Sequence, residues 1–327
     1  MEQRMHSPVF IVGMPRSGTK LLRGMLNGHS QIFIPLNETE FLPAWIRRWA
    51  SFGNLSNRHT FMEFYQRFGD TFYFQNRMAE HGEQIRPDVW YNRCDGDFSI
   101  ANVFEQLIRH DAKVPEGAIW GDKSPSYLNH IESIRAIYPT AKFIHLIRDA
   151  RDYVLSLEKA FGKNRLRAAQ RWNDAMFLAK EEGERLGTDF IEVRYEDVVD
   201  APEREARRLC SFLDLDFESS MIALQRATEN LGDTKGSHRI VAGNYGKYKA
   251  QMNNDELRSV EAYCAEGLNQ MGYTVLQHTG PNNRLTPLEE RKHQAGDVWR
   301  LIQIDARDKG WFEAMNSRVS HFIKTQW

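Results

Sequence analysis

The chain has 327 residues, 41% of them hydrophobic and 27% charged, which is enough to bury the core of one large domain or of one domain with a cap. A net charge of −1 argues against a general attraction to nucleic acid or to anionic membranes, so we expect no nucleic-acid partner. The three cysteines share no C-x-x-C spacing, which argues against a disulfide framework or a structural zinc site.

The sequence also lacks the signals of export and membrane insertion. The first eight residues hold no apolar signal segment, and no stretch approaches the roughly 18 consecutive apolar residues of a membrane span. We therefore expect a soluble, cytoplasmic protein whose cysteines stay free in a reducing compartment.

Five short apolar or β-branched runs predict strands, at residues 9–12, 32–34, 118–120, 142–147 and 189–193. Helical patterns separate most of these runs, and this alternation predicts an α/β fold with a central parallel sheet of about five strands. Because the first strand leads through a tight loop into a helix, we expect a P-loop NTPase-like fold of three layers.

The loop after the first strand runs from Gly13 to Lys20 and reads G-M-P-R-S-G-T-K. Its glycines let the backbone close around an anion, to which the next helix offers its unpaired N–H groups. A kinase P-loop has the order G-x-x-x-x-G-K-[ST], whereas Thr19 here precedes the lysine. An arginine in such a turn needs an anionic partner, so the loop predicts a phosphate or sulfate site.

Residues 40–115 carry many aromatic side chains without strand alternation. We interpret them as a helical insertion between the second and third strands. Aromatics at this spacing usually form a core, although an insertion at this place can also border an acceptor cleft.

Two later helices have clear boundary signals. Asp200 and Pro202 predict the N-cap and first turn of one, and residues 254–271 predict another that ends at Gly272. Beyond Tyr273 the composition turns polar. We therefore divide the chain into a domain of residues 1–273 and a region of residues 274–327. This region is a linker and a C-terminal helical appendage, which packs on its own domain or, alternatively, on a neighbouring copy in a homo-oligomer.

A second motif lies at residues 143–156, where a buried strand ends at Arg148 and opens a helix that carries Ser156. Parallel sheets bind ligands at the carboxyl ends of their strands, so both side chains are candidates for a bound ligand. Arg148 has the alternative of binding a structural carboxylate such as Asp152. We expect Arg151 and Asp152 to form a solvated or helix-terminal ion pair.

The two motifs together resemble those of sulfotransferases that use 3′-phosphoadenosine 5′-phosphosulfate (PAPS), above all the tyrosylprotein sulfotransferases and their bacterial relatives. The resemblance runs from Pro8 to about Tyr273. The loop P-R-S-G-T resembles their 5′-phosphosulfate loop, and Arg148 followed eight residues later by Ser156 resembles their 3′-phosphate site. The resemblance implies in-line transfer of a sulfuryl group from PAPS to an acceptor hydroxyl, with the 3′,5′-bisphosphate PAP as product and no metal.

The resemblance also implies residue roles. Glu38 becomes the catalytic base, and Lys123 becomes the lysine of the sulfuryl group. The implied cofactor-binding residues are Arg16, Ser17, Gly18, Thr19, Lys20, Arg148, Ser156, Tyr195, Ser237 and Lys247. Arg16, Lys20 and the loop amides are placed to neutralise the leaving 5′-phosphate, so Arg16 also counts as catalytic.

The sequence departs from this family pattern in several places. Lys20 stands where the tyrosylprotein group has a second threonine, and the acidic segment needs a one-residue insertion, which leaves Glu40 as an alternative base. Glu38 has the alternative role of a cap for the helix that begins near residue 40. The paired cysteines of secretory members have no clear counterpart. Cytosolic sulfotransferases generally use a histidine as the base, but the sequence context of that histidine is not evident here. The histidines that lack it are His29, His130, His145 and His238.

Two other functions stay open. One is a P-loop kinase for a small metabolite or nucleoside, with Asp149 or Asp122 as magnesium ligand. The other is a non-catalytic nucleotide-binding protein. For a sulfotransferase, the sequence leaves the acceptor open between a peptide tyrosine, a sugar, a lipid and a small metabolite.

Overall fold

The structure is a computed structural model that describes residues 7–69, 71–81, 84–227 and 234–311. Within these residues, five strands form one parallel sheet in the order β2-β3-β1-β4-β5. The strands are β1 (Val9–Gly13), β2 (Ile32–Phe33), β3 (Ile119–Lys123), β4 (Lys142–Ile147) and β5 (Phe190–Arg194). The predicted α/β class and parallel sheet are confirmed. Strand β3 continues three residues further than predicted, so Asp122 and Lys123 lie inside a strand.

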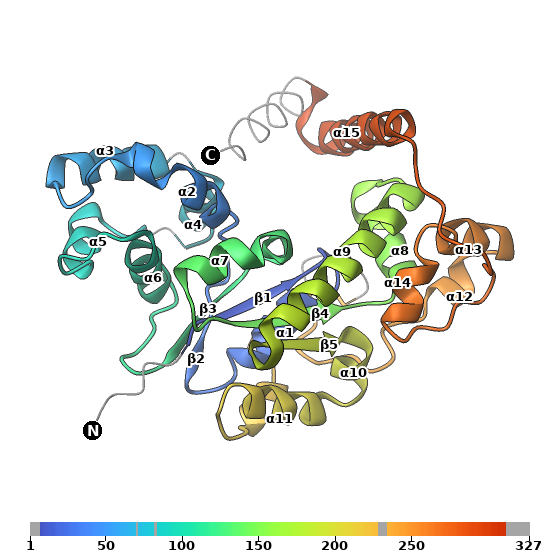
Figure 1. The fold of residues 1–327 in the computed structure, drawn as a ribbon, viewed down its shortest axis with the longest axis horizontal. Coiled ribbons are helices and arrows are strands. Elements are labelled where there is room, and N and C mark those ends of the chain that lie inside the picture. The colour runs from blue at the N-terminus through green and yellow to red at the C-terminus, as the bar shows by residue number, and fades with distance from the viewer. Residues whose placement is uncertain (1–6, 70, 82–83, 228–233, 312–327) are drawn as a thin grey trace.

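Helices fill the connections between the strands (Figure 1). The first connection holds α1 (Thr19–Leu26). The second holds α2 (Leu42–Arg48), η1 (Trp49–Phe52), α3 (Arg58–Gly69), α4 (Phe72–His81), α5 (Pro87–Arg93) and α6 (Ile100–Asp111). The third holds η2 (Pro125–His130) and α7 (Ile131–Ile137). The fourth holds α8 (Ala150–Phe161), α9 (Arg165–Leu186) and η3 (Gly187–Asp189). After β5 come α10 (Tyr195–Asp200), α11 (Pro202–Phe212), η4 (Ser219–Ile222), α12 (Tyr248–Gln251), α13 (Asn254–Glu261), α14 (Ala265–Gln270) and α15 (Pro287–Lys309).

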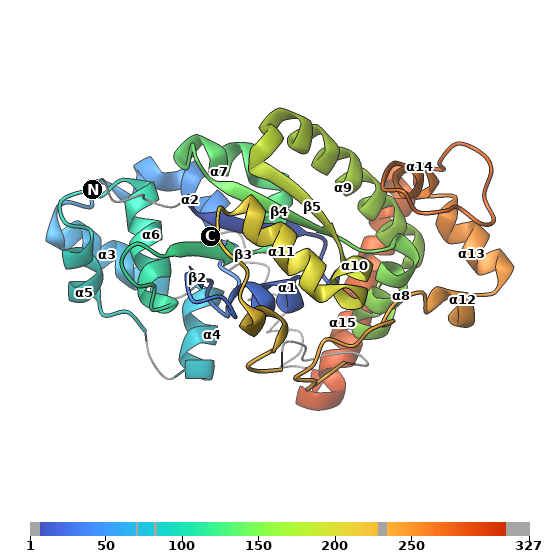
Figure 2. The ribbon, with the colours of Figure 1, turned by 90° about the horizontal axis from the view of Figure 1, so that it is seen from below.

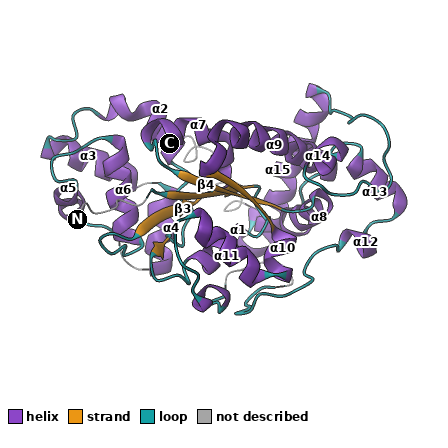
Figure 3. Ribbon diagram, turned by 60° about the horizontal axis from the view of Figure 1, so that its bottom comes forward, coloured by secondary structure: helices purple, strands orange, loops and turns teal. Residues whose placement is uncertain are grey.

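The sheet lies between two helical layers (Figure 3). Side chains alternate between its faces, because successive residues of a strand point in opposite directions. Phe10 and Phe143 join the core that includes α9 and the insertion helices. Val9 and Ile144 join a second core with α1 and α11. Each strand therefore contributes to both cores, which explains its nearly continuous apolar sequence.

The aromatic residues between β2 and β3 form the core of α2 to α6. Trp45, Phe68 and Trp90 are buried there and contact one another, with ring centroids 4.9 to 6.2 Å apart. These helices lie together at one end of the molecule (Figure 1). The interpretation of the aromatics as a core thus holds for the side chains that the structure describes.

Two helix boundaries differ from the prediction. Asp200 ends α10 instead of capping α11, and its carboxylate accepts a hydrogen bond from the Gly243 amide at 3.1 Å. The helix expected over residues 254–271 is divided into α13 and α14, with the cap glycine Gly272 just after the second. At the break, the Ala262 carbonyl accepts a hydrogen bond from the Asn283 amide at 2.6 Å. A tertiary contact thus occupies a carbonyl at the point where the helix is interrupted.

Helix α15 begins with a capping box, in which Thr286 and Glu289 bond each other's backbone. It packs beside α8 (Figures 1 and 2). Its buried Asp297 accepts hydrogen bonds from the Asn164 amide at 2.7 Å and from Arg167 Nη1 at 3.1 Å. The described part of the predicted appendage is therefore tied to the α8–α9 turn, while residues 312–327 lie outside the described residues. Among the described helices, none is both long and apolar enough to cross a membrane.

The turn between β1 and α1 depends on the glycine at its end. Gly18 has a φ of +95°, and a Cβ atom there would lie 2.4 Å from Cδ2 of the Tyr195 ring. Tyr195 begins α10, directly after β5. The absence of a side chain at Gly18 therefore lets α10 pack against the loop.

We expect Gly18→Ala to destabilise the fold by roughly 2 to 4 kcal/mol, because it combines backbone strain with overlap against the ring. In a Tyr195→Ala background the same change should cost only about 1 to 2 kcal/mol, since the strain alone remains. Urea unfolding of the natural protein, the two single variants and the double variant measures the energetic coupling between Gly18 and Tyr195. Gly117→Ala is the matched control, because Gly117 has a φ of +77° with no atom within 4 Å of the added Cβ. Equal costs of Gly18→Ala in both backgrounds would disprove the packing argument.

Candidate active site

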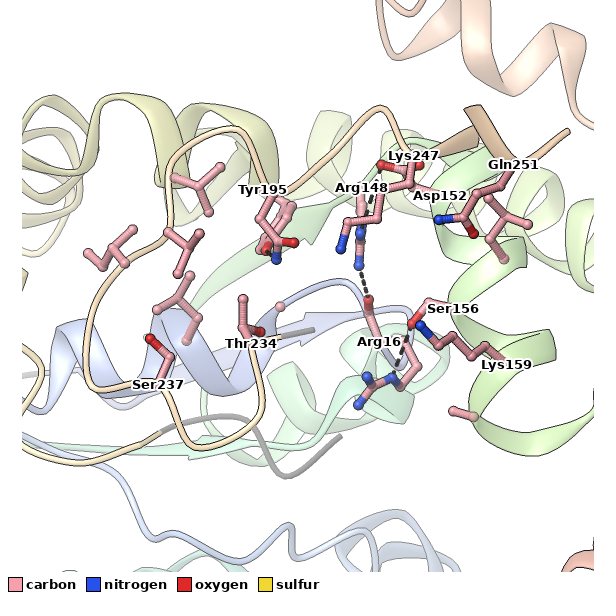
Figure 4. Close-up of a pocket in the computed structure, with 18 of the residues that line it drawn as sticks. Arg16, Arg148, Asp152, Ser156, Lys159, Tyr195, Thr234, Ser237, Lys247 and Gln251 are labelled. Atoms are coloured by element: carbon pink, nitrogen blue, oxygen red, sulfur yellow. Dashed lines mark hydrogen bonds and ion pairs between the residues drawn. The ribbon is translucent and has the colours of Figure 1, made fainter. Parts of the chain in front are cut away.

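A cavity of about 300 Å³ opens beside the loop between β1 and α1. Its walls come from this loop, from α8, from the start of α10 and from the segment 234–251 (Figure 4). The lining includes Arg16, Gly18, Arg148, Asp152, Ser156, Lys159, Tyr195, Ser237, Asn244 and Lys247. The structure thus brings together seven of the predicted cofactor-binding residues, and it adds Asp152, Lys159 and Asn244.

The loop itself presents one basic side chain to the cavity. Arg16 has a φ of +71°, a left-handed conformation that is uncommon outside glycine, and its Nε donates to Ser156 Oγ at 3.3 Å. Ser17 and Thr19 are buried beneath the loop, and Ser17 Oγ has no hydrogen-bond partner. Gly18 precedes α1 without a side-chain cap. The first N–H groups of α1 and the Ser17 hydroxyl are thus donors suited to an anion.

Arg148 connects the loop to the next two elements. It follows β4, and its Nη1 donates to the Arg16 carbonyl at 3.2 Å. Its guanidinium lies 4.8 Å from the centroid of the Tyr195 ring, a cation–π contact. Its Nη2 lies 3.8 Å from Asp152 Oδ2. Arg148 was predicted to bind a phosphate or, alternatively, a structural carboxylate such as Asp152. The structure shows the contact with Asp152.

Asp152 and Arg151 do not form the predicted surface ion pair, since each is 2% exposed. Asp152 accepts hydrogen bonds from the amides of Gly246 at 2.6 Å and Tyr248 at 3.1 Å, and burial raises the pKa of its carboxyl. Arg151 instead binds Asp149 at 2.7 Å and Glu261 at 2.8 Å. The expected pair is wrong because both side chains are turned into the core by the packing of α8.

The late loop of residues 243–248 is fixed against the cavity by these contacts. Besides Asp152, it is held by Tyr195, whose hydroxyl accepts from Asn244 Nδ2 at 2.7 Å. Lys247 and Ser237 line the cavity from this side. Arg148 lies just before α8, and Asp152 and Ser156 follow it on the helix at intervals of four residues. This spacing is the sequence signal that could have identified Asp152.

A second polar group lies at the ends of β2 and β3. Lys123 is 1% exposed at the end of β3, and its Nζ forms an ion pair with Glu38 Oε1. Burial lowers the pKa of Lys123, while the charge of Glu38 opposes this effect. The charges of Arg23 and Lys20 on α1 also lower it, so both lie close to this ion pair. Glu38 and Lys123 thus form a centre of their own, next to the helix that follows the loop.

The segment that carries Glu38 is held from β3 and η2. Ser124 Oγ accepts from the Thr39 amide at 3.0 Å and from the Glu40 amide at 3.3 Å. Thr39 Oγ1 is hydrogen-bonded to the Tyr127 hydroxyl at 2.5 Å. Glu38 precedes this turn, and α2 begins only at Leu42, with Phe41 at its N-cap, so Glu38 does not cap that helix.

The acidic groups around the ion pair have altered proton affinities. Burial of its carboxyl, together with the charge and hydrogen bond of Glu38, raises the pKa of Glu40 to about 7. Burial raises the pKa of Asp122 to about 6, against the opposing charge of Lys123. A carboxyl that titrates near neutral pH is suited to proton transfer.

The histidines and the candidate magnesium ligands have other surroundings. The His29 ring accepts at Nδ1 from the Gln31 amide and donates from Nε2 to the Asp216 carbonyl. His145 is fully buried within β4, and His238 is exposed. Asp149 is bound to Arg151, and no group of three potential metal ligands occurs within the part of the chain that the structure describes.

Comparison with known proteins identifies one family. The profile of the sulfotransferase family matches residues 8–219. Protein-tyrosine sulfotransferase A of Caenorhabditis elegans is 27% identical over 225 residues, which is 65% of this chain and 51% of that protein. The omega-hydroxy-beta-dihydromenaquinone-9 sulfotransferase Stf3 of Mycobacterium bovis is 29% identical over 185 residues, 50% of this chain and 43% of that protein. The chain thus spans about half the length of these curated relatives.

A solved structure supports the same fold. The sulfotransferase domain from the curacin biosynthetic pathway aligns with a TM-score of 0.50 and 22% identity, and the match covers 84% of this chain and all of that domain. The family profile covers more than half of the chain and includes the loop, Glu38, Lys123 and the Arg148 to Ser156 motif. The resemblance recognised in the sequence is therefore confirmed: the chain belongs to the sulfotransferase family.

Proposed function

We propose that the protein transfers a sulfuryl group from PAPS to an acceptor hydroxyl. The observation that carries the proposal is the convergence of Arg16, Arg148 and Ser156, from two distant motifs, on one cavity. The two phosphate-bearing ends of a nucleotide need more than one basic group, and both Arg16 and Arg148 line this cavity. The names of the relatives agree with it, since they include both a protein-tyrosine and an omega-hydroxy-dihydromenaquinone sulfotransferase, two kinds of hydroxyl acceptor.

In this proposal the loop holds the 5′ end of the donor. Arg16, Lys20 and the amides of residues 17–19 neutralise the charge that develops on the leaving 5′-phosphate. Arg148 and Ser156 bind the 3′-phosphate. Two groups of opposite charge, the Glu38 carboxylate and the Lys123 ammonium, act at the transferred group. Glu38 takes the acceptor's proton and Lys123 stabilises the sulfuryl oxygens, while the alignment of the reactants lowers the barrier.

The remaining cofactor-binding roles follow from position. Tyr195 and Gly18 pack against each other at the cavity wall, and Ser237 and Lys247 lie on its late-loop side, so we assign them to the nucleotide. Ser17 and Thr19 are assigned to the 5′-phosphosulfate through their hydroxyl and amide groups. No observation favours the alternative of a P-loop kinase.

We also propose the division of the chain into a sulfotransferase domain of residues 1–273, with residues 40–115 as a helical insertion beside the acceptor cleft, and a C-terminal appendage of residues 274–327. The contacts of Asp297 with the α8–α9 turn support packing of the appendage on its own chain. A cytoplasmic location is supported by the three cysteines, all buried and free.

The first test is thermal unfolding with PAP, compared with ATP plus magnesium. A ligand at about 100 times its dissociation constant stabilises by about 2.7 kcal/mol, which raises the Tm by several degrees. We expect PAP to stabilise the protein, and Arg148→Ala to weaken PAP binding by roughly 10- to 100-fold through the loss of a charge-assisted contact.

Arg207→Ala is the matched control, because Arg207 is an exposed arginine of α11 whose partner is Glu203. It should leave PAP binding unchanged. Stabilisation by ATP with magnesium but not by PAP would overturn the proposed function.

The second test concerns the base. Glu38→Gln should keep PAP affinity within about 2-fold, yet lower turnover by roughly 100-fold or more, because the neutral amide cannot take the acceptor's proton. PAP release from PAPS, with a tyrosine peptide or a long-chain alcohol as acceptor, measures turnover. The control is Glu184→Gln, an exposed glutamate of α9. Full turnover of Glu38→Gln with a working acceptor would show that another group is the base.

A further inference from the structure

Glu38 is one of two glutamates on the same turn. Glu40 follows it by two residues, and the side chains lie close enough for the charge of Glu38 to raise the pKa of the Glu40 carboxyl. Glu38 in turn forms an ion pair with the buried Lys123. The candidate base is therefore part of a connected chain of three ionisable groups, in the order Lys123, Glu38 and Glu40.

The backbone of Glu40 is held in an unfavourable conformation. Its φ of +51° is left-handed, which is uncommon for a residue with a side chain. The hydrogen bonds from the Thr39 and Glu40 amides to Ser124 Oγ, and that between Thr39 Oγ1 and the Tyr127 hydroxyl, fix the turn in this shape. Such strain persists only where the surroundings impose it, and it is concentrated at functional sites. Here it places two carboxyl groups together.

The charges around Glu40 favour its protonated form. From its own turn it faces Glu38, and from β3 it faces Asp122, whose negative charge also raises its pKa. Lys123 is the opposing positive charge. The Tyr127 phenol is also near enough for Glu40 to affect its pKa. Glu40 is an exposed residue as a whole, but burial of its carboxyl group and these neighbours bring its pKa to about 7.

We propose that Glu38 and Glu40 act as one carboxylate pair that receives the acceptor's proton, and that Glu40 is the member that retains it. This inference rests on the proposed function. The ammonium of Lys123 is the partner of Glu38 in an ion pair, whereas Glu40 has no cation as close to it as Lys123 is to Glu38 within the described interactions. Two carboxyl groups in contact share a single proton more readily than they stay doubly charged.

Transfer of the sulfuryl group and loss of the acceptor's proton are coupled. The acceptor oxygen forms a bond to sulfur, the bond from sulfur to the 5′-phosphate oxygen breaks, and the phosphate leaves with its electron pair. The hydroxyl proton passes to the Glu38 carboxylate and from there to Glu40. Both carboxylates must be ionised beforehand, so activity falls as the pH decreases through about 7, the pKa of Glu40.

The test compares the pH dependence of kcat/KM in five proteins: the natural protein, Glu40→Gln, Glu38→Gln, the double variant of these two, and the control Glu184→Gln. In the natural protein and the control we expect an acid limb near pH 7. Glu40→Gln should move this limb to lower pH by one unit or more and reduce the plateau by about 10-fold, because a weaker base remains. The effects of Glu38→Gln and Glu40→Gln should be less than additive in the double variant, since the two groups act as a unit.

A second readout needs no acceptor. Glutamate labelled with ¹³C at the carboxyl carbon reports each titration by NMR, and the two variants assign the signals. We expect Glu40 to titrate near pH 7, and to titrate at least one unit lower in Glu38→Gln, where the neighbouring negative charge is gone and Lys123 is unpaired. A Glu40 signal that titrates near its ordinary value of 4.5, or an acid limb that Glu40→Gln leaves in place, would overturn the pair.

The two proposals can fail separately. A protein that PAP does not stabilise overturns the proposed function, and with it the catalytic role of the pair. A protein that binds PAP and turns over PAPS, but whose Glu40 titrates near 4.5, overturns the pair alone.

Discussion

The position of the Arg148 guanidinium is the interaction on which the rest of the site depends. It donates to the Arg16 carbonyl in the loop after β1, contacts the Tyr195 ring at the start of α10, and faces Asp152 on α8, the helix that follows it. Asp152 then holds the late loop through two amides. One cation thus links four segments that are far apart in the sequence.

The second centre is governed by the cost of burying a charge. Lys123 is almost fully buried in β3, where an ammonium without a counter-ion would be strongly unfavourable. Glu38 supplies the counter-ion, and the turn that carries Glu38 is in turn fixed by Ser124, the residue after Lys123. Lys123 and the acidic turn therefore depend on each other, and the charge of the lysine is compensated within the site itself.

Much of the framework followed from local sequence. The five apolar runs identified all the strands of the described sheet, because a parallel strand buried on both faces needs apolar side chains throughout. The glycine spacing of the first loop and the Arg148 to Ser156 spacing identified two motifs that the fold brings to one cavity. Boundaries were less accurate. Asp200 has the composition of an N-cap, yet its carboxylate binds the Gly243 amide, and α13 and α14 separate where the Ala262 carbonyl binds Asn283.

The sequence by itself determined the order of the elements, the glycine-bounded loop after the first strand and the identity of the basic and acidic side chains, since these depend on local patterns and on residue chemistry. Only the tertiary structure decided which charges meet. The contact of Lys123 with Glu38 and the burial of Asp152 against the late loop join residues 85 and 96 positions apart in the sequence. Electrostatic energy depends on distance in space and on exclusion of water, and neither is encoded in any single stretch of the chain.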